Sequence, residues 1–266
     1  TEVINFNNST KAPGDIHIIP VVVHVIHLGE AVGTGTNISD AQINSAIDNL
    51  TDTYRNAFGN SIDNNIEFQL AIRDENCNTT TGIVRVDGSG VPGYLADGVN
   101  GGTAGADENT LKDLSKWNTD QYMNFWIVSE IDGNNGGAGV QGWANLPFPG
   151  YDAYDGSVMM ASSFGYDPLN LQPSWPLNFA RDNSTPIHEV GHFLSLYHTF
   201  HGDGGGGACP GNVTVGTDSD GCADTPPHMR NSSTCPVNGT NNPCAAGTLD
   251  EVKLNYMDYS SCPEKF

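Results

Sequence analysis

The segment 184–200, STPIHEVGHFLSLYHTF, holds the residues whose types and spacing are most capable of chemistry. His188 and His192 are four residues apart, so on a helix their side chains lie on one face, about 6 Å from each other. Two imidazoles at that separation can hold one tetrahedral zinc ion. Glu189 follows the first histidine, and H-E-x-x-H on a helix supplies two metal ligands and a general base.

A catalytic zinc needs a third ligand, and His198 is the candidate. On a helix that continued past His192, His198 would be rotated by roughly 240° from the metal face, because each residue adds about 100°. We therefore expect the helix to end near Ser195, so that the chain turns back toward the metal. Thr185 is the expected N-cap of this helix, with Pro186 in its first position.

The other histidines are assigned structural roles. His17, His24 and His27 lie in or beside a predicted strand, where His24 and His27 point to opposite faces. His201 and His228 lie in loops, and the sequence indicates no partner for either of them.

Patterns upstream of the histidine segment predict the elements that position it. A dense β-branched run at 17–27 predicts a buried strand, with Pro20 indicating an edge position or an irregular start. The segment 39–42 (SDAQ) forms a capping box ahead of apolar residues at helical spacing, so we expect a helix over 40–58. Further strands are predicted at 66–73, 83–86, 122–129 and 156–161, and a short helix at 111–117. This order predicts an α+β fold with helices packed on one sheet.

Composition excludes several classes of protein. The 266 residues include 31 acidic and 10 basic side chains, a formal net charge of −21. Such a charge repels phosphate backbones, so we expect no nucleic-acid partner. The longest apolar run, 18–23, is far shorter than the roughly 20 residues of a membrane span. Neither repeats nor a clear linker divide the chain, so we expect one folding unit and a monomer.

The six cysteines indicate an oxidising environment. Five of them fall within 209–262, a stretch rich in Gly, Pro, Asn, Ser and Thr that has almost no apolar periodicity. An even number of cysteines where the core is poorest is typical of a disulfide framework. The C-x2-C spacing of a structural zinc cluster does not occur. We therefore expect a secreted protein, in its mature form after removal of a signal and a pro-segment.

The extended motif His188-Glu189-x-x-His192-x-x-Ser195-x-x-His198, followed by NYMDY at 255–259, resembles the metzincin zinc peptidases. Within that clan the chain is similar to the pappalysins, the cytophagalysin-like group. The matching stretches are IPVVVHVIH with SDAQI, then HEVGH with LYHTF, then ADTP and NYMDYS, in the same order from about residue 17 to the end. One residue departs from the metzincin pattern, since Ser195 stands where the family has glycine. We expect the turn to persist with Ser195 mildly strained.

The resemblance implies a metzincin-type catalytic domain over residues 1–266. Its N-terminal subdomain, 1–194, would hold a twisted, mostly parallel mixed sheet, a backing helix and the zinc helix above. Its C-terminal subdomain, 195–266, would be an irregular, disulfide-stapled lower part with the methionine turn. A peptide substrate would lie extended in the cleft between them, with strand 122–129 near the rim and pairing by β-addition.

The resemblance also implies roles for individual residues. The zinc ligands would be His188, His192 and His198. Glu189 would be the general base for the attacking water and would carry the proton to the leaving amine. Met257 would form the floor beneath the histidines without binding the metal. Tyr259 would help to hold the oxyanion, and the alternative is an ordinary core tyrosine with a satisfied hydroxyl.

A second cation is expected at an acidic loop, where 218–224 packs three carboxylates into seven residues. Calcium would relieve their repulsion with mixed side-chain and carbonyl oxygens, and the alternative is a solvated Asx-turn cluster. The resemblance implies calcium ligands at Asp220, the Cys222 carbonyl, Asp224 and Thr225, and Asp203 is a further candidate. It also implies the disulfides Cys209–Cys235 and Cys244–Cys262, which leaves Cys77–Cys222 as the third.

These inferences predict a secreted zinc endopeptidase that also binds calcium. The alternative is a non-catalytic, cation-stabilised extracellular binding or adhesion module with a structural zinc. The intact Glu189 argues against that alternative, because a structural zinc site needs no base.

Overall fold

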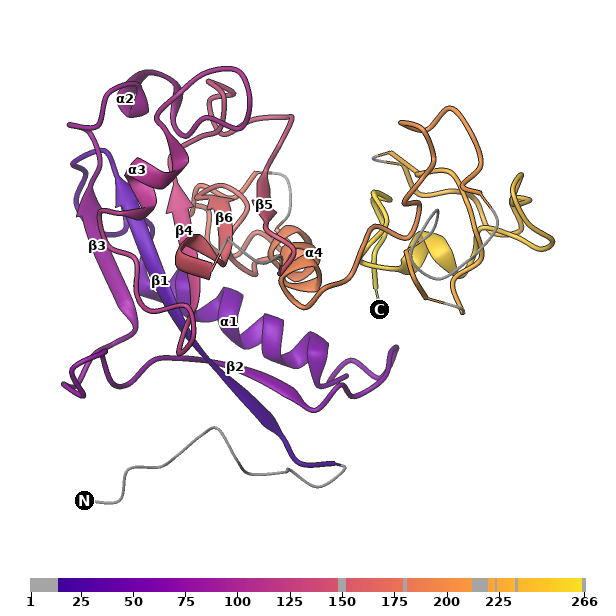
Figure 1. Cartoon of the computed structure of the whole chain (residues 1–266), viewed down its shortest axis with the longest axis horizontal. Coiled ribbons are helices and arrows are strands. Elements are labelled where there is room, and N and C mark those ends of the chain that lie inside the picture. The colour runs from indigo at the N-terminus through magenta and orange to yellow at the C-terminus, as the bar shows by residue number, and fades with distance from the viewer. Residues whose placement is uncertain are drawn as a thin grey trace.

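The structure of the protein is a computed structural model, which describes residues 14–147, 152–178, 181–211, 220–222, 224–232 and 234–264. A twisted sheet flanked by helices forms the N-terminal part, and an irregular C-terminal part lies beyond helix α4 (Figure 1). Within the described residues, no helix combines the length and the apolar character needed to cross a membrane.

The sheet contains six strands and is mostly parallel. Its strands are β1 (His17–His27), β2 (Ile66–Leu70), β3 (Ile83–Asp87), β4 (Met123–Val128), β5 (Gly142–Ala144) and β6 (Ser157–Met160). Their order is β2-β1-β4-β6-β5, and β3 pairs with the second half of β1. The edge strand β5 alone runs antiparallel, against β6. The predicted mixed, mostly parallel sheet is therefore confirmed.

Strand β1 is central and buried, as its β-branched run predicts. Val21, Val22 and Val23 are fully buried, because helices cover both faces of the sheet. The helices α1 (Asp40–Tyr54) and α4 (Ser184–Phe193) contribute to one core, and α2 (Tyr94–Asp97) and α3 (Glu108–Lys112) to the other. Pro20 pairs with β2 just before the pairing with β4 begins, so at this position β1 has a neighbouring strand on one side only, which a proline tolerates.

Helix α1 begins as predicted but ends earlier. The Ser39 hydroxyl accepts the N–H of Gln42 at 3.1 Å, which is the first half of the capping box. The Gln42 side chain does not reach back to Ser39; its amide donates to the carbonyls of Ala161 and Phe164, at 3.1 and 2.8 Å. The helix stops at Tyr54 rather than residue 58, and Asn56 takes a positive φ of 53°.

Helix α4 starts at Ser184, two residues before the expected first position, Pro186. Its N-cap is Asn183, in a left-handed conformation with φ 63°. The Asn183 side chain bonds Ala46 and Gly165 instead of capping its own helix, and Asp182 accepts the N–H of Ser184 at 3.1 Å. Pro186 therefore occupies the third helical position, where a missing N–H still breaks no helical bond.

Other predicted boundaries need correction. Strand β2 stops at Leu70 rather than residue 73, and α3 lies at 108–112 rather than 111–117. The sequence did not predict β5 or α2, because elements of three and four residues carry too little periodicity.

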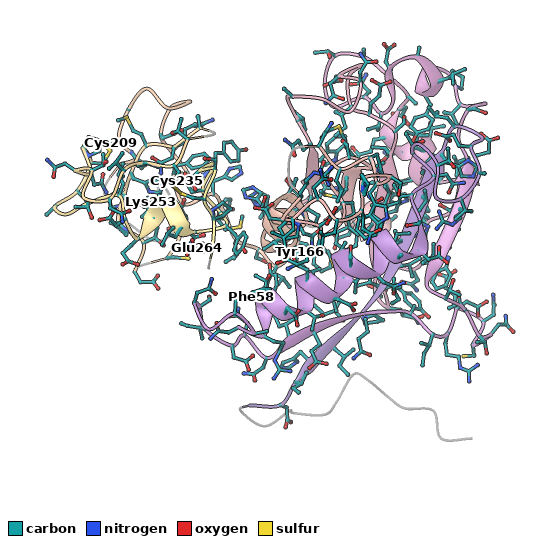
Figure 2. The ribbon with its side chains drawn as sticks, turned by 180° about the vertical axis from the view of Figure 1, so that it is seen from behind. Phe58, Tyr166, Cys209, Cys235, Lys253 and Glu264 are labelled. Carbon is teal, nitrogen blue, oxygen red and sulfur yellow. A yellow bond between two sulfur atoms is a disulfide. The ribbon has the colours of Figure 1, made fainter. Side chains whose placement is uncertain are left out.

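Two disulfides cross-link the C-terminal part, in which the 3-10 helix η2 (Val252–Leu254) is the regular element described (Figure 2). They join Cys209 to Cys244 and Cys235 to Cys262. The expected pairs Cys209–Cys235 and Cys244–Cys262 are therefore wrong. The N–H of Ser261 donates to the Thr234 carbonyl at 3.1 Å, and this strand-like contact places Cys235 beside Cys262.

The expected bond between Cys77 and Cys222 is also wrong, since both cysteines are free. Cys77 is exposed in the connection between β2 and β3, which lies on the far side of the sheet from the C-terminal part (Figure 1). Cys222 belongs to that C-terminal part, so the two thiols are not placed for a bond.

Candidate active site

Three histidines converge where α4 ends. The Nε2 atom of His198 lies 3.0 Å from that of His192 and 3.1 Å from that of His188. Their candidate ligand atoms all lie within 4.8 Å of one another, and the described residues contain no other such group of His, Cys, Asp and Glu. The structure thus brings together the three side chains that the sequence singled out.

The turn that returns His198 to the other two histidines has a Schellman geometry. Helix α4 ends at Phe193, and Ser195 follows with φ 79°. The N–H of Leu196 donates to the Gly191 carbonyl and that of Ser195 to the His192 carbonyl, both at 2.9 Å. These two bonds satisfy carbonyls that the ended helix leaves open. The expected turn at Ser195 is therefore confirmed, with Ser195 in the left-handed region.

Backbone carbonyls orient two of the rings. The Nδ1 of His188 lies 2.6 Å from the Tyr256 carbonyl, and the Nδ1 of His192 lies 2.8 Å from the Leu196 carbonyl. A carbonyl only accepts, so both Nδ1 atoms carry the proton and both Nε2 atoms present lone pairs. The Nε2 of His198 can donate to only one of them. A cluster of facing lone pairs fits a divalent metal held by nitrogen ligands.

Burial keeps these imidazoles neutral. The pKa of His188 is lowered to about 4 by burial and by the neighbouring His192. The pKa of His198 is lowered to about 3, again by burial first and then by the adjacent histidines. Neutral imidazole is the form that binds a metal.

Glu189 is a buried carboxyl beside the cluster. It is 7% exposed, and burial raises its pKa to about 8, against a hydrogen bond from the Ala144 backbone. Since Ala144 ends β5, the edge strand fixes the orientation of this carboxyl. A carboxyl with a pKa near neutrality can both accept and release a proton at physiological pH.

Tyr259 and Met257 come from the segment that passes under the histidines. The Tyr259 ring lies 4.8 Å from that of His198 and 5.7 Å from that of His188, between ring centroids. Met257 is 2% exposed, and its carbonyl accepts the N–H of Thr199, next to His198, at 3.1 Å. The methionine segment is thus bonded directly to the loop that carries the third histidine.

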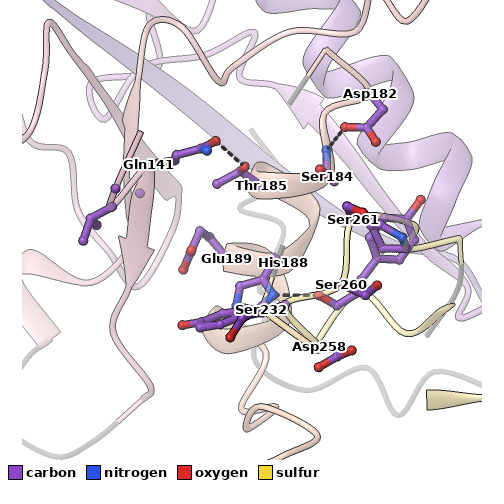
Figure 3. A pocket seen from close by; sticks show the side chains of 16 residues that line it. Gln141, Asp182, Ser184, Thr185, His188, Glu189, Ser232, Asp258, Ser260 and Ser261 are labelled. Atoms are coloured by element: carbon purple, nitrogen blue, oxygen red, sulfur yellow. Dashed lines mark hydrogen bonds between the residues drawn. The ribbon is translucent and has the colours of Figure 1, made fainter. Parts of the chain in front are cut away.

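A cleft of about 640 Å³ opens beside His188 and Glu189. Its walls come from 139–142, from the start of α4 with Asp182, and from 256 and 258–261 with Pro263 (Figure 3). Figure 3 also shows the Gln141 side chain bonded to Thr185 across one wall, at 3.2 Å. The cleft therefore lies between the sheet part and the C-terminal part.

The expected role of strand 122–129 at the cleft rim is wrong. Strand β4 pairs with β1 on one side and with β6 on the other, so it has no free edge for a substrate. The edge strand is β5, and the cleft lining includes Gly142 from it. Only a strand with unpaired N–H and C=O groups can add another strand.

The acidic loop is partly described. Asp218 lies outside the described residues. Asp220 is 7% exposed and accepts the N–H of Cys222 at 2.9 Å and a bond from the Thr225 side chain, while Asp224 is exposed. Burial and the nearby Asp224 raise the pKa of Asp220. Asp203, the further candidate, is occupied by Arg230, which forms an ion pair with it at 2.6 Å.

Sequence reasoning missed three groups around the histidines. They are the Ala144 N–H, the pair Arg230–Asp203, and the buried pair of His228 and Asp258, whose side chains lie 3.5 Å apart. The two partners of each pair are separated by 27 to 45 residues in the sequence, so no local sequence pattern predicts these contacts.

The family model described as pregnancy-associated plasma protein-A, Peptidase_M43, matches residues 106–266, more than half of the chain. The chain belongs to this family. The matched residues include the H-E-x-x-H helix, the third histidine and the methionine segment, so the resemblance to the pappalysins is confirmed.

Relatives agree with this assignment. An extracellular metalloprotease of Podospora anserina is 29% identical over 93% of this chain and 69% of its own length. Another, of Arthroderma benhamiae, is 26% identical over 98% of this chain and 77% of its own length. The solved structure of mature mirolysin from Tannerella forsythia, in complex with a cleaved peptide, has a TM-score of 0.69 at 31% identity and covers 96% of this chain and 88% of its own.

The chain is therefore a zinc-dependent metalloendopeptidase with a metzincin-type fold, and the non-catalytic alternative is not favoured. The names of its relatives agree with the secreted location predicted from the cysteines.

Proposed function

We propose that this pappalysin hydrolyses peptide bonds at the cluster of His188, His192 and His198, with these three side chains as the zinc ligands. The observation that carries the proposal is the convergence of three Nε2 atoms, with the buried Glu189 beside them and an open cleft in front. When bound, zinc would activate a water molecule and polarise the carbonyl of the scissile bond.

Glu189 is the proton carrier in this proposal. Its carboxylate accepts a proton from the attacking water and then donates that proton to the nitrogen of the departing amine. Burial raises its pKa above the ordinary value, which supports the second half of this cycle, because the carboxyl then holds the proton longer before it passes to the amine. The Ala144 N–H keeps the carboxyl aimed in one direction.

In this proposal the Tyr259 hydroxyl donates a hydrogen bond to the substrate oxygen that becomes negative during the attack. The ring contacts to His188 and His198 support this assignment, since the phenol lies next to two of the proposed zinc ligands. Met257 precedes Asp258 and Tyr259 in the sequence and is buried. In this proposal it packs beneath the histidines and binds no metal.

A polypeptide substrate binds extended along β5 and occupies the cleft. The free edge of β5 and the cleft-lining residues 139–142 support this placement, and mature mirolysin has been solved with a cleaved peptide. Each of the two parts 1–194 and 195–266 contributes a wall of the cleft, which supports one catalytic unit that needs both. We expect this unit to act as a monomer.

Calcium binds at Asp220, Asp224, Thr225 and the carbonyl of Cys222. Asp220 is buried, and its partners there, the Cys222 N–H and the Thr225 side chain, are both neutral. A hard cation with oxygen ligands would compensate that buried charge. Chelation by EGTA should therefore lower the thermal midpoint, and an unchanged midpoint would remove calcium from the account.

The test of the proposed function is the hydrolysis of casein by Glu189→Ala and by the wild type. Wild-type cleavage should be stopped by 1,10-phenanthroline, and Glu189→Ala should lose cleavage by several orders of magnitude while it keeps one zinc. Glu75→Ala, at an exposed carboxyl outside the cleft lining, is the matched control and should cleave normally. Undiminished cleavage by Glu189→Ala would refute the mechanism, and a wild type that binds zinc without cleaving would favour a structural site.

A further inference from the structure

The Tyr259 phenol needs a support that its own burial does not supply. The residue is 42% exposed, so contacts with neighbouring side chains, and not enclosure in the core, must restrict its rotamers. Four groups contact its ring: His188, His198, Phe200 and the guanidinium of Arg230, whose Cζ lies 5.8 Å from the ring centroid. Two of these four are the proposed metal ligands. The remaining two, Phe200 and Arg230, contact the ring without being proposed metal ligands.

Arg230 is itself held rigidly by Asp203. Its Nε donates to one carboxylate oxygen at 2.8 Å and its Nη2 to the other at 2.6 Å. The backbone N–H of Arg230 adds a third bond at 3.2 Å, and Asp203 is only 2% exposed. Two parallel bonds fix the plane of a guanidinium as well as its position.

Phe200 connects this clamp to the histidines. The Cζ of Arg230 lies 4.6 Å from the centroid of the Phe200 ring, within the range of a cation–π contact. The same ring stacks on His198, with 4.8 Å between centroids and 8° between planes. It meets the Tyr259 ring edge to face at 4.8 Å. One buried ring thus touches the clamp, the third histidine and the phenol.

We propose that Arg230 is a positioning residue for the reaction: clamped by Asp203 and stacked on Phe200, it holds the Tyr259 phenol beside the three histidines. The inference rests on the proposed role of Tyr259. Lysine does not replace arginine here, because an ammonium is a point charge that offers neither the planar fork nor the same stacking surface.

A double-mutant cycle of Arg230→Met with Tyr259→Phe tests the proposal. We expect Arg230→Met to lower kcat for a peptide substrate about tenfold while KM changes by less than about twofold, because the phenol is misplaced and the substrate still binds. Tyr259→Phe should lower kcat at least as much, and the double variant should be no slower than Tyr259→Phe alone. Arg230→Lys should behave like Arg230→Met. Thermal midpoint and zinc content are measured for every variant.

Arg55→Met is the matched control. Its side chain is 26% exposed against 28% for Arg230, and it is likewise paired with an aspartate, Asp63. It should leave kcat unchanged. If Arg230→Met does not fold, Asp203→Asn replaces it in the cycle, since it loosens the clamp and leaves the guanidinium in place.

Other results of the double-mutant cycle would overturn either this proposal or the role of Tyr259. Effects of Arg230→Met and Tyr259→Phe that multiply would overturn the proposal, because Arg230 would then act independently of the phenol. A wild-type kcat in Arg230→Met would overturn it too. A wild-type kcat in Tyr259→Phe would instead refute the role of Tyr259 in the proposed function, while loss of cleavage by Glu189→Ala would still stand.

Discussion

Ser195 occupies a left-handed conformation, φ 79°, at the position that ends α4 and redirects the chain to His198. A Cβ atom in that conformation costs about 1 kcal/mol, a strain that glycine avoids. The Schellman bonds and the histidine cluster hold Ser195 there despite the strain. We therefore expect Ser195→Gly to raise the free energy of unfolding by about 1 kcal/mol and to keep full activity.

Chemical denaturation measures that change, and Ser195→Ala is the control. Alanine keeps the Cβ and lacks only the hydroxyl, so it should bring no gain. Equal stabilisation by alanine and glycine would show that the serine hydroxyl, and not the backbone, is the unfavourable feature.

His24 is a second residue that lowers the stability of the folded chain, and it does so only at acidic pH. It is fully buried in β1, its Nε2 lies 2.8 Å from the Asn124 side chain, and its ring stacks on Trp126. Burial lowers its pKa from 6.5 to about 4, opposed by the bond to Asn124. The unfolded chain therefore takes up this proton before the folded chain does, so acid favours unfolding.

The contribution of His24 is complete above pH 6.5 and is lost as the pH falls toward 4, for a total of roughly 3 kcal/mol. Urea unfolding of the wild type and of His24→Gln at about pH 7.5 and about pH 4.5 measures it. The variant should show a smaller drop in stability between the two pH values. The exposed His17→Gln should retain the wild-type drop, and identical drops in all three proteins would contradict the assignment.

At the scale of elements, Asn183 fixes where helix α4 begins. Its amide donates to the Ala46 carbonyl of α1 at 2.9 Å, and its side-chain oxygen accepts the N–H of Gly165 at 3.3 Å. The residue is fully buried. Helix α4 is thus tied by one side chain to α1 and to the segment after β6.

Asn183→Ala should lower the free energy of unfolding by about 2–4 kcal/mol, because it leaves buried polar groups unpaired and keeps a positive φ on alanine. Asn170→Ala is the control, since Asn170 also has a positive φ, 52°, but is exposed. A thermal or chemical melt distinguishes them. If both variants lose the same stability, the backbone conformation and not the buried bonds dominates at Asn183.

The sequence predicts the elements with strong local signals and misses those that depend on tertiary contacts. The run at 17–27 predicts β1 with its observed bounds, and the histidine spacing predicts both α4 and the turn at Ser195. Strand β5 exists because it pairs with β6, and the three residues Gly142–Ala144 carry no such information by themselves. For the same reason β4 could be recognised as a strand while its place inside the sheet could not.

Site residues follow the same division. The histidines and Glu189 share one short motif, so their spacing identifies them. Arg230, Asp203 and the Ala144 N–H meet the site only after folding. The disulfide pairing was mistaken for this reason as well, since four cysteines in an irregular stretch permit several pairings and only the chain path selects one.

At the scale of the whole molecule, the cleft depends on a C-terminal part with little regular structure. Its bridges close segments with sequence separations of 35 and 27 residues, and loops of that length are each stabilised by about 3–4 kcal/mol in the chain-entropy model. The part also carries Tyr259 and Met257. We therefore expect the protein to be active only when this C-terminal part is folded.

Reduction of the disulfides with a thiol should abolish cleavage and lower the thermal midpoint. Cys262→Ser, which removes one disulfide, should also lower both the activity and the midpoint. Cys77→Ser should change neither, because that thiol is free and exposed. Peptide mapping of the unreduced protein should recover Cys209 with Cys244 and Cys235 with Cys262. Full activity after complete reduction would show that the bridges are dispensable.

The most direct test of the central claim is the zinc content of the wild type and of His198→Ala, measured by mass spectrometry of metals after dialysis against a weak chelator. The account predicts one zinc per wild-type chain and loss of most of it in His198→Ala, because the turn at Ser195 brings that ring to the other two. A wild type without zinc, or a variant that holds zinc as tightly as the wild type, would contradict it.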